Sequence, residues 1–113
     1  MLSIVIPVHN EEGILESLVQ GLTSGLQNFT DDYEIILSEN GSLDQTRQLA
    51  QAIARQDARI VVLSDDQASY GRAIRAGILH SRGDHIILFN ADLWDMDFLR
   101  RALTLLDQYD IVI

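Results

Sequence analysis

The residues best suited to chemistry stand in four polar segments, each directly after an apolar run of the chain. They are His9 to Glu12, residues 39–44 (ENGSLD), Asp65 with Asp66, and Asn90, Asp92 and Asp95. Carboxylates predominate in these segments, accompanied by amide and hydroxyl groups. Such oxygen-rich groups suit a divalent cation such as Mg²⁺ or Mn²⁺, or the hydroxyls of a sugar or ribose.

The apolar runs that position these segments are predicted strands, alternating with helices. Strands are predicted over residues 2–8, 33–38, 59–63 and 85–89, which are short, apolar and rich in β-branched side chains. Apolar residues at helical spacing predict helices over 12–27, 46–56 and 70–81, and a last helix around 98–106. Ser42 and Gln45 fit a capping box before the second helix. Residues 110–113 (DIVI) are expected to begin a fifth strand.

This order predicts an α/β fold with a mainly parallel open sheet and helices on both faces. Ligands of such sheets bind outside the carboxyl ends of the strands, so the four polar segments are expected to share one rim. The alternative is that the acids simply begin helices, as caps or first-turn residues. This alternative explains Glu12 and Asp44 better than Glu39 and Asp92, which fall at strand edges.

The composition excludes several classes of protein. At 113 residues the chain fits one globular domain, and the absence of cysteine excludes disulfides, thiolate metal sites and a catalytic cysteine. A net charge of -9 argues against nucleic acid as a partner. No apolar run approaches the roughly 20 residues of a membrane span. The glycine-rich motifs of dinucleotide-binding domains and P-loop NTPases are also absent.

Four segments resemble the family 2 glycosyltransferases. They are VIPVHNEE at 5–12, ENGSLDQT at 39–46, YGRAIRAGILHSRGD at 70–84 and NADL at 90–93, in the order that the family has them. The resemblance, which extends to the polyprenyl-phosphate sugar synthases, implies the Rossmann-like nucleotide-binding half of a GT-A fold. It also implies a nucleotide-diphospho-sugar donor, a divalent cation (Mg²⁺ or Mn²⁺) and inversion at the anomeric carbon.

The resemblance further assigns roles to single residues. Donor binding is implied for Pro7, Asn10, Glu11, Glu39, Asn40, Gly41, Ser42, Gly71, Asn90 and Ala91. Asp92 matches the second acid of the D-x-D metal motif, whereas Asn90 replaces the first. Glu39 stands where the family has the aspartate that reads the base. After Leu93 the sequence WDMDF departs from the family's usual glutamine-containing continuation.

Several of these residues have simpler explanations that the sequence leaves open. Gly41 can be the turn residue of a strand-to-helix corner, and Ser42 a helix cap. Gly71 and Gly77 can allow a helix to pack closely on the sheet. His9 faces the expected site, while Tyr70 and Trp94 can either stack on a base or sugar or cover the core.

These patterns predict that residues 1–113 form the donor-binding N-terminal portion of an inverting glycosyltransferase. The acceptor is expected to be a polyprenyl phosphate or a glycan hydroxyl. Because the resemblance implies that the general base and the acceptor-binding residues belong to a following half of the domain, we expect this chain to be inactive alone. The alternative is a non-catalytic nucleotide- or metal-binding α/β module. We also expect a cytoplasmic location, at the membrane face in the full-length protein, and a homodimer through the exposed C-terminal edge.

Overall fold

The computed structural model describes residues 1–28, 30–92 and 94–105. In this part of the chain, strands and helices alternate and the strands form one parallel sheet in the order β3-β2-β1-β4. The strands are β1 (Leu2–Val8), β2 (Tyr33–Asn40), β3 (Ile60–Asp65) and β4 (His85–Leu88). The helices are α1 (Leu15–Leu26), α2 (Thr46–Gln56), α3 (Tyr70–His80) and α4 (Met96–Leu105). The predicted α/β class is confirmed.

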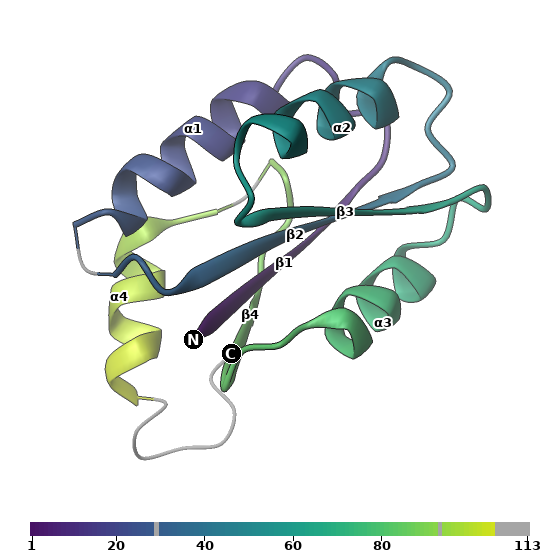
Figure 1. The fold of residues 1–113 in the computed structure, drawn as a ribbon. Coiled ribbons are helices and arrows are strands. Elements are labelled where there is room, and N and C mark those ends of the chain that lie inside the picture. Colours follow the sequence, from purple (N-terminus) through teal and green to yellow (C-terminus); the bar gives the residue numbers. More distant parts are fainter. Residues whose placement is uncertain (29, 93, 106–113) are drawn as a thin grey trace.

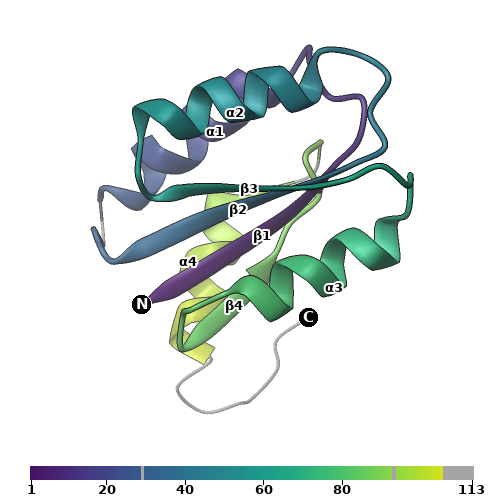
Figure 2. The same cartoon turned by 45° about the vertical axis from the view of Figure 1, so that its right-hand side comes forward.

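The helices lie on both faces of the sheet, with α1 and α2 on one face and α3 on the other (Figures 1 and 2). The central strands β1 and β2 are buried at every position. Alternate residues of these strands, such as Ile4 and Ile35, join α1 in the main core cluster, and Leu99 brings α4 into it. No helix in the described residues is long and apolar enough to cross a bilayer.

The structure changes some predicted element boundaries and one predicted cap. α1 begins at Leu15 rather than at residue 12, and β2 continues to Asn40. The capping box is wrong, because Gln45 caps α2 without any side-chain hydrogen bond. The hydroxyl of Ser42 accepts from Asn10 N instead, at 3.1 Å. The fifth strand predicted at 110–113, and the homodimer edge that depends on it, lie outside the described residues.

Three glycines of the resembling segments have different structural roles. Gly41 has a φ of 57°, so it is the left-handed turn residue that ends β2. Gly77 packs α3 directly on β1, because a Cβ atom there would overlap Val5 Cγ1. Around Gly71 a Cβ atom would meet nothing within 4 Å. Close packing therefore explains Gly77 but not Gly71.

A buried carboxylate fixes the turn between α3 and β4 to the amino ends of β1 and β2. Glu34 is 1% exposed and accepts from Ser3 Oγ at 2.6 Å and from Arg82 N at 2.7 Å. Gly83 N in turn donates to Ser3 Oγ at 2.8 Å. Burial by itself raises the pKa of Glu34, but these hydrogen bonds and the Arg82 guanidinium outweigh it and hold that pKa below its ordinary value.

The contrast between the two glycines of α3 predicts opposite effects of one substitution. Gly77→Ala should lower the free energy of unfolding by about 1–3 kcal/mol, because the added methyl group overpacks against Val5. Gly71→Ala should leave it unchanged or raise it by up to about 1 kcal/mol through helix propensity. Denaturant unfolding of both variants measures the difference, and adding Val5→Ala to Gly77→Ala should recover part of the loss. Equal effects of the two alanines would contradict the close contact.

Ionised Glu34 should contribute stability at neutral pH that is lost in acid. Its folded-state pKa lies below the unfolded value of about 4.3, so the contribution is present above that value and disappears as the pH falls through the folded-state pKa. Glu34→Gln should therefore cost about 1–3 kcal/mol at pH 7 and progressively less in acid. Denaturant unfolding curves recorded from pH 7 into acid measure this loss of stability, with the substitution of the exposed Glu16 on α1 by glutamine as the control. A cost that does not change with pH would contradict the assignment.

Candidate functional site

A cleft opens at the carboxyl ends of the strands, where β2 and β4 leave β1 on opposite sides. This is the switch point at which open α/β sheets bind ligands. The cleft has a volume of about 460 Å³, and we call it the rim cleft. It is lined by Pro7, His9, Glu11, Asn40, Ala68, Tyr70, Asn90, Ala91 and Asp92.

Two loops beside the rim cleft are joined by hydrogen bonds between side chains and backbone. We call residues 9–12 the first loop and residues 40–46 the second loop. Side chains of the second loop accept hydrogen bonds from three successive backbone N–H groups of the first loop. Asn10 N donates to Ser42 Oγ at 3.1 Å, Glu11 N donates to Thr46 Oγ1 at 2.8 Å, and Glu12 N donates to Asp44 Oδ2 at 3.4 Å.

Side chains of the first loop in turn accept hydrogen bonds from the backbone of the second loop. Leu43 N donates to Asn10 Oδ1 at 2.8 Å, and Gln45 N donates to Glu12 Oε2 at 3.0 Å. The Asn10 backbone has a φ of 52°, a left-handed conformation that this pairing holds in place. The side chain of Asn10 therefore joins the loops and does not line the rim cleft.

Glu39 lies at the end of β2 but turns away from the rim cleft. Its side chain is 0% exposed, and its two oxygens accept from Ser42 N at 2.8 Å and from Arg47 Nε at 2.7 Å. Burial raises the pKa of Glu39, but these two hydrogen bonds and the Arg47 charge outweigh it and leave the pKa below its ordinary value. Sequence reasoning missed Arg47, because the resembling motif gives no reason to expect a cation in the first turn of α2.

The remaining predicted residues divide between the cavities. Gly41 and Ser42 line a separate cavity of about 200 Å³ together with Arg47 and Asp66. Gly71 is exposed in the first turn of α3 and lines neither of these cavities. The rim cleft thus brings together the predicted Pro7, Glu11, Asn40, Asn90, Ala91 and Asp92, but not Asn10, Glu39, Gly41, Ser42 or Gly71.

Three residues of the rim cleft were not among the predicted site residues. His9 donates from Nδ1 to the Asn40 carbonyl at 2.6 Å, which fixes its ring against the cleft wall. Tyr70 is 59% exposed, and its hydroxyl donates to Asn90 Oδ1 at 2.8 Å. Ala68 precedes α3, and no motif in the sequence indicates that it belongs to a site. Trp94, by contrast, packs against the core cluster and lines a different cavity together with Phe89, Asp95 and Phe98.

The rim cleft carries negative charge that the fold does not compensate. Within the described residues, no hydrogen bond or ion pair reaches the carboxylate of Glu11 or of Asp92. Burial raises the pKa of Glu11, and the neighbouring charges of Asp92 and Asp44 raise it further, against a smaller opposite effect of His9. A bound cation would relieve this repulsion.

The oxygen groups of the rim cleft fit a cation that shares its coordination with a ligand. Among residues 1–28, 30–92 and 94–105, no three His, Cys, Asp or Glu side chains are grouped to enclose a metal ion. Asp92 and Glu11 supply carboxylates, and Asn90 a neutral amide oxygen. Mg²⁺ commonly takes one or two protein carboxylates and completes its shell with water and substrate phosphates.

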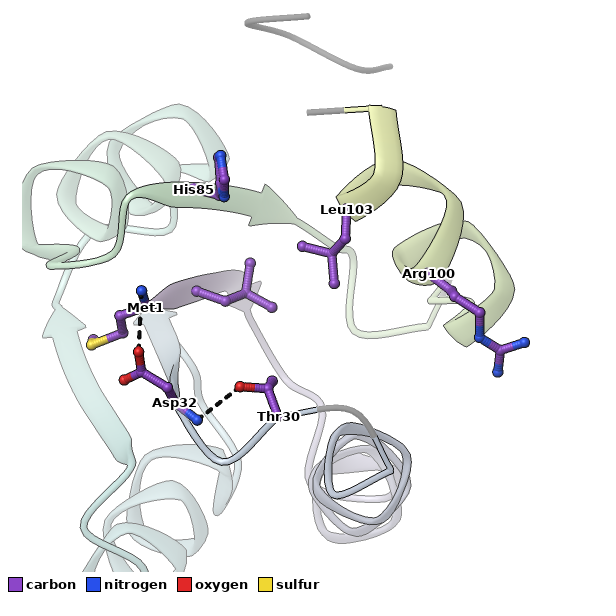
Figure 3. Close-up of a pocket in the computed structure, with 7 residues that line it drawn as sticks. Met1, Thr30, Asp32, His85, Arg100 and Leu103 are labelled. Carbon is purple, nitrogen blue, oxygen red and sulfur yellow. Dashed lines mark hydrogen bonds and ion pairs between the residues drawn. The ribbon is translucent and has the colours of Figure 1, made fainter. Parts of the chain in front are cut away.

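A further cavity lies at the amino ends of the strands (Figure 3). Its volume is about 390 Å³, and its lining includes Leu2, His85, Arg100 and Leu103. The carboxylate of Asp32 points at the chain's amino group, 3.3 Å away. None of the predicted site residues lines this cavity, so the rim cleft is the candidate functional site.

The sequence matches known proteins over nearly its whole length. Residues 3–113 match the family model described as Glycosyl transferase family 2. An undecaprenyl-phosphate 4-deoxy-4-formamido-L-arabinose transferase of Pseudomonas paraeruginosa is 39% identical over 95 residues, which cover 82% of this chain and 28% of that protein. The transferase of the same name from Edwardsiella ictaluri is 33% identical over 114 residues, covering 97% and 35%. The chain therefore spans about a third of the length of these curated relatives.

The fold also matches solved structures. The crystal structure of S. aureus TarS 1-349 superposes with a TM-score of 0.76 at 19% identity, covering 96% of this chain and 33% of that one. The structure of TarS 1-349 in complex with UDP gives the same TM-score and covers 32% of that chain. At this identity the likeness shows a shared fold. The family match over residues 3–113, in turn, shows that this chain belongs to glycosyl transferase family 2.

Proposed function

We propose that the rim cleft binds a nucleotide-diphospho-sugar, and that the chain is the donor-binding portion of an inverting glycosyltransferase. The observation that carries this proposal is the uncompensated negative charge of Glu11 and Asp92 at the switch point of the sheet. Relatives named undecaprenyl-phosphate sugar transferases, and a neighbour in fold solved with UDP, support it.

The reaction is a direct displacement at the anomeric carbon of the sugar. An acceptor oxygen forms the new bond to this carbon, and the bond to the diphosphate oxygen breaks, so that the nucleoside diphosphate leaves with the electron pair. Asp92 would hold a divalent cation, Mg²⁺ or Mn²⁺, which supplies electrostatic stabilisation of the departing diphosphate. Glu11 adds negative charge beside it, and Asn90 and Tyr70 offer polar groups to the donor.

The acceptor decides whether a general base is needed. A polyprenyl phosphate is already anionic and attacks without one, whereas a glycan hydroxyl must lose a proton. We assign no general base to a residue of this chain. The chain spans about a third of its relatives, so we expect acceptor binding and transfer to require further sequence, with the full-length enzyme at the cytoplasmic face of a membrane.

A non-catalytic nucleotide- or metal-binding module is the second candidate. The neutral Asn90 favours it, because one carboxylate of the metal motif is lost. Both candidates predict ligand binding by this chain, but only the glycosyltransferase predicts sugar transfer by a full-length protein containing it. Transfer assays on the full-length protein, with UDP- and GDP-sugars, separate the two.

Cation-dependent donor binding should depend on Asp92. We expect calorimetric titration to show tighter binding of a UDP- or GDP-sugar with Mn²⁺ than without it. Asp92→Asn should lower the affinity in Mn²⁺ by about 10-fold or more, since even groups that only orient a metal ligand cost about 10–100-fold. Asp31→Asn removes an equal charge at the opposite end of the sheet and should have no effect. Binding that ignores both Mn²⁺ and Asp92→Asn would refute the role of Asp92.

Restoring the missing acid should strengthen the cation site. Asn90→Asp places a third carboxylate in the rim cleft, beside those of Glu11 and Asp92, and cation affinity rises with the number of charged ligands. We expect Mn²⁺ to bind more tightly in the presence of a sugar nucleotide, as measured by calorimetry at equal donor concentration. An unchanged or weaker affinity would show that position 90 does not face the cation.

A further inference from the structure

The segment that joins β4 to α4 carries Asp92 and passes through the rim cleft. It leaves the sheet after Phe89, whose backbone N donates to the carbonyl of Val5 at 3.1 Å. In the described part of the chain, the side-chain hydrogen bond that reaches residues 90–92 comes from the Tyr70 hydroxyl to Asn90. At the start of α4, Asp95 Oδ1 accepts from Asp97 N at 2.8 Å.

After Asp92 the chain packs against two glycines of α1. A Cβ atom on Gly21 would lie 2.6 Å from Cη2 and 2.8 Å from Cζ2 of Trp94, so the indole fills the space that a side chain would take. One turn later, a Cβ atom on Gly25 would lie 2.6 Å from Cε of Met96. Trp94 and Met96 also pack against the core cluster. We call Gly21 and Gly25 the glycine slot.

We propose that Trp94, seated in the glycine slot, is a positioning residue for Asp92, and that Gly21 is the residue that makes room for it. This inference rests on the proposed function, because the position of Asp92 matters only if its carboxylate holds a cation. Trp94 follows Asp92 closely in the chain, so a displaced indole pulls on the backbone that carries the carboxylate. Neither Gly21 nor Trp94 lines the rim cleft, so any effect of these residues on a bound cation is indirect, and we assign it to the position of Asp92.

The two side chains that pack against the glycine slot differ in stiffness. The indole of Trp94 is rigid, and its ring cannot yield to a methyl group on Gly21 without moving as a whole. The contact at Gly25 is made by the end of the flexible Met96 side chain, which can adopt another rotamer. The effect on Asp92 should therefore be concentrated at Gly21, with Gly25 as an internal comparison.

A purely structural role for Trp94 makes a different prediction from a positioning role. Loss of packing alone lowers the free energy of unfolding but leaves the response of donor binding to Mn²⁺ as it was. Misplacement of Asp92 reduces the gain in donor affinity that Mn²⁺ provides, while the affinity without metal stays the same. The ratio of donor affinities with and without Mn²⁺ is therefore the measurement that separates the two roles.

The test is Gly21→Ala in the 113-residue chain, with a UDP- or GDP-sugar as the probe. Trp94 is the sole tryptophan, so its fluorescence reports directly on the slot, and the emission should shift to longer wavelength as the indole moves out. The affinity ratio should fall by about 10- to 100-fold, the range found when groups that orient a metal ligand are changed. The affinity without metal should not change.

A second substitution provides the rescue. In Gly21→Ala combined with Trp94→Phe, the shorter ring leaves room for the methyl group, so most of the lost ratio should return. Gly25→Ala should cost less than Gly21→Ala, and Ser24→Ala, on the exposed side of α1, should change nothing. If Gly21→Ala does not fold, Trp94→Leu removes the same contact without adding atoms to α1 and should also lower the ratio.

The outcomes distinguish this inference from the function on which it rests. A displaced indole with an unchanged Mn²⁺ ratio would overturn the positioning role, and so would a double variant that does not recover. A wild-type chain that binds no sugar nucleotide, with or without Mn²⁺, would refute the proposed function itself. Wild-type binding that responds to Mn²⁺ leaves only the role of Trp94 and Gly21 to be decided.

Discussion

Beyond the ends of β1 and β2, the backbone N–H groups of the two loops have no neighbouring strand to accept their hydrogen bonds. Side chains of the two loops accept these hydrogen bonds reciprocally, and each such bond contributes about 0.5–1.5 kcal/mol. Ser42, Asp44 and Thr46 accept from the first loop, while Asn10 and Glu12 accept from the second. The five hydrogen bonds together join the two loops at the rim of the sheet.

This pairing divides the polar residues of the motifs into two groups with different roles. The side chains of Asn10 and Ser42 accept hydrogen bonds from the neighbouring loop. Glu11 donates only its backbone N–H to Thr46, so its carboxylate remains available in the rim cleft. Burial, and after it the charge of Asp92, raises the pKa of Glu11, so the ionised carboxylate opposes folding. The hydrogen bonds between the two loops contribute in the opposite direction and hold the backbone of Glu11 beside the rim cleft.

The sequence predicted the sheet and the end of the sheet at which the candidate site lies, because both depend on local patterns. Short apolar runs marked the strands, and the rule for parallel sheets brought their polar ends together. Side-chain direction was harder to predict. The S-x-x-Q pattern at Ser42 is the same whether the hydroxyl reaches its own helix or the neighbouring loop. Glu39 turns from the cleft because of Arg47, a contact that exists only once α2 has packed.

The glycines of α3 and α1 show how much of the helix packing can be predicted from the spacing of small residues. Ala73 and Gly77 stand four residues apart, so both face the sheet, and the small side of α3 can be located from the sequence. Gly71 lies off that line and has open space around it. Gly21 and Gly25 show the same spacing on α1, but the sequence of α1 does not indicate which side chains pack against these two glycines. Trp94 and Met96 are distant in sequence, and only the fold brings them there.

Two departures from the family pattern meet in the segment after β4 and have a common physical consequence. Asn90 removes a charge, and Trp94 places a rigid apolar ring where the family usually continues toward a glutamine. A cation with several protein ligands pulls a mobile loop into shape, because each ligand adds its own coordination energy. A cation with few charged ligands gains less in this way. Under the proposed function, the position of Asp92 would then be set before the cation binds, by packing, and the indole of Trp94 against Gly21 is a rigid contact close to Asp92 in the chain.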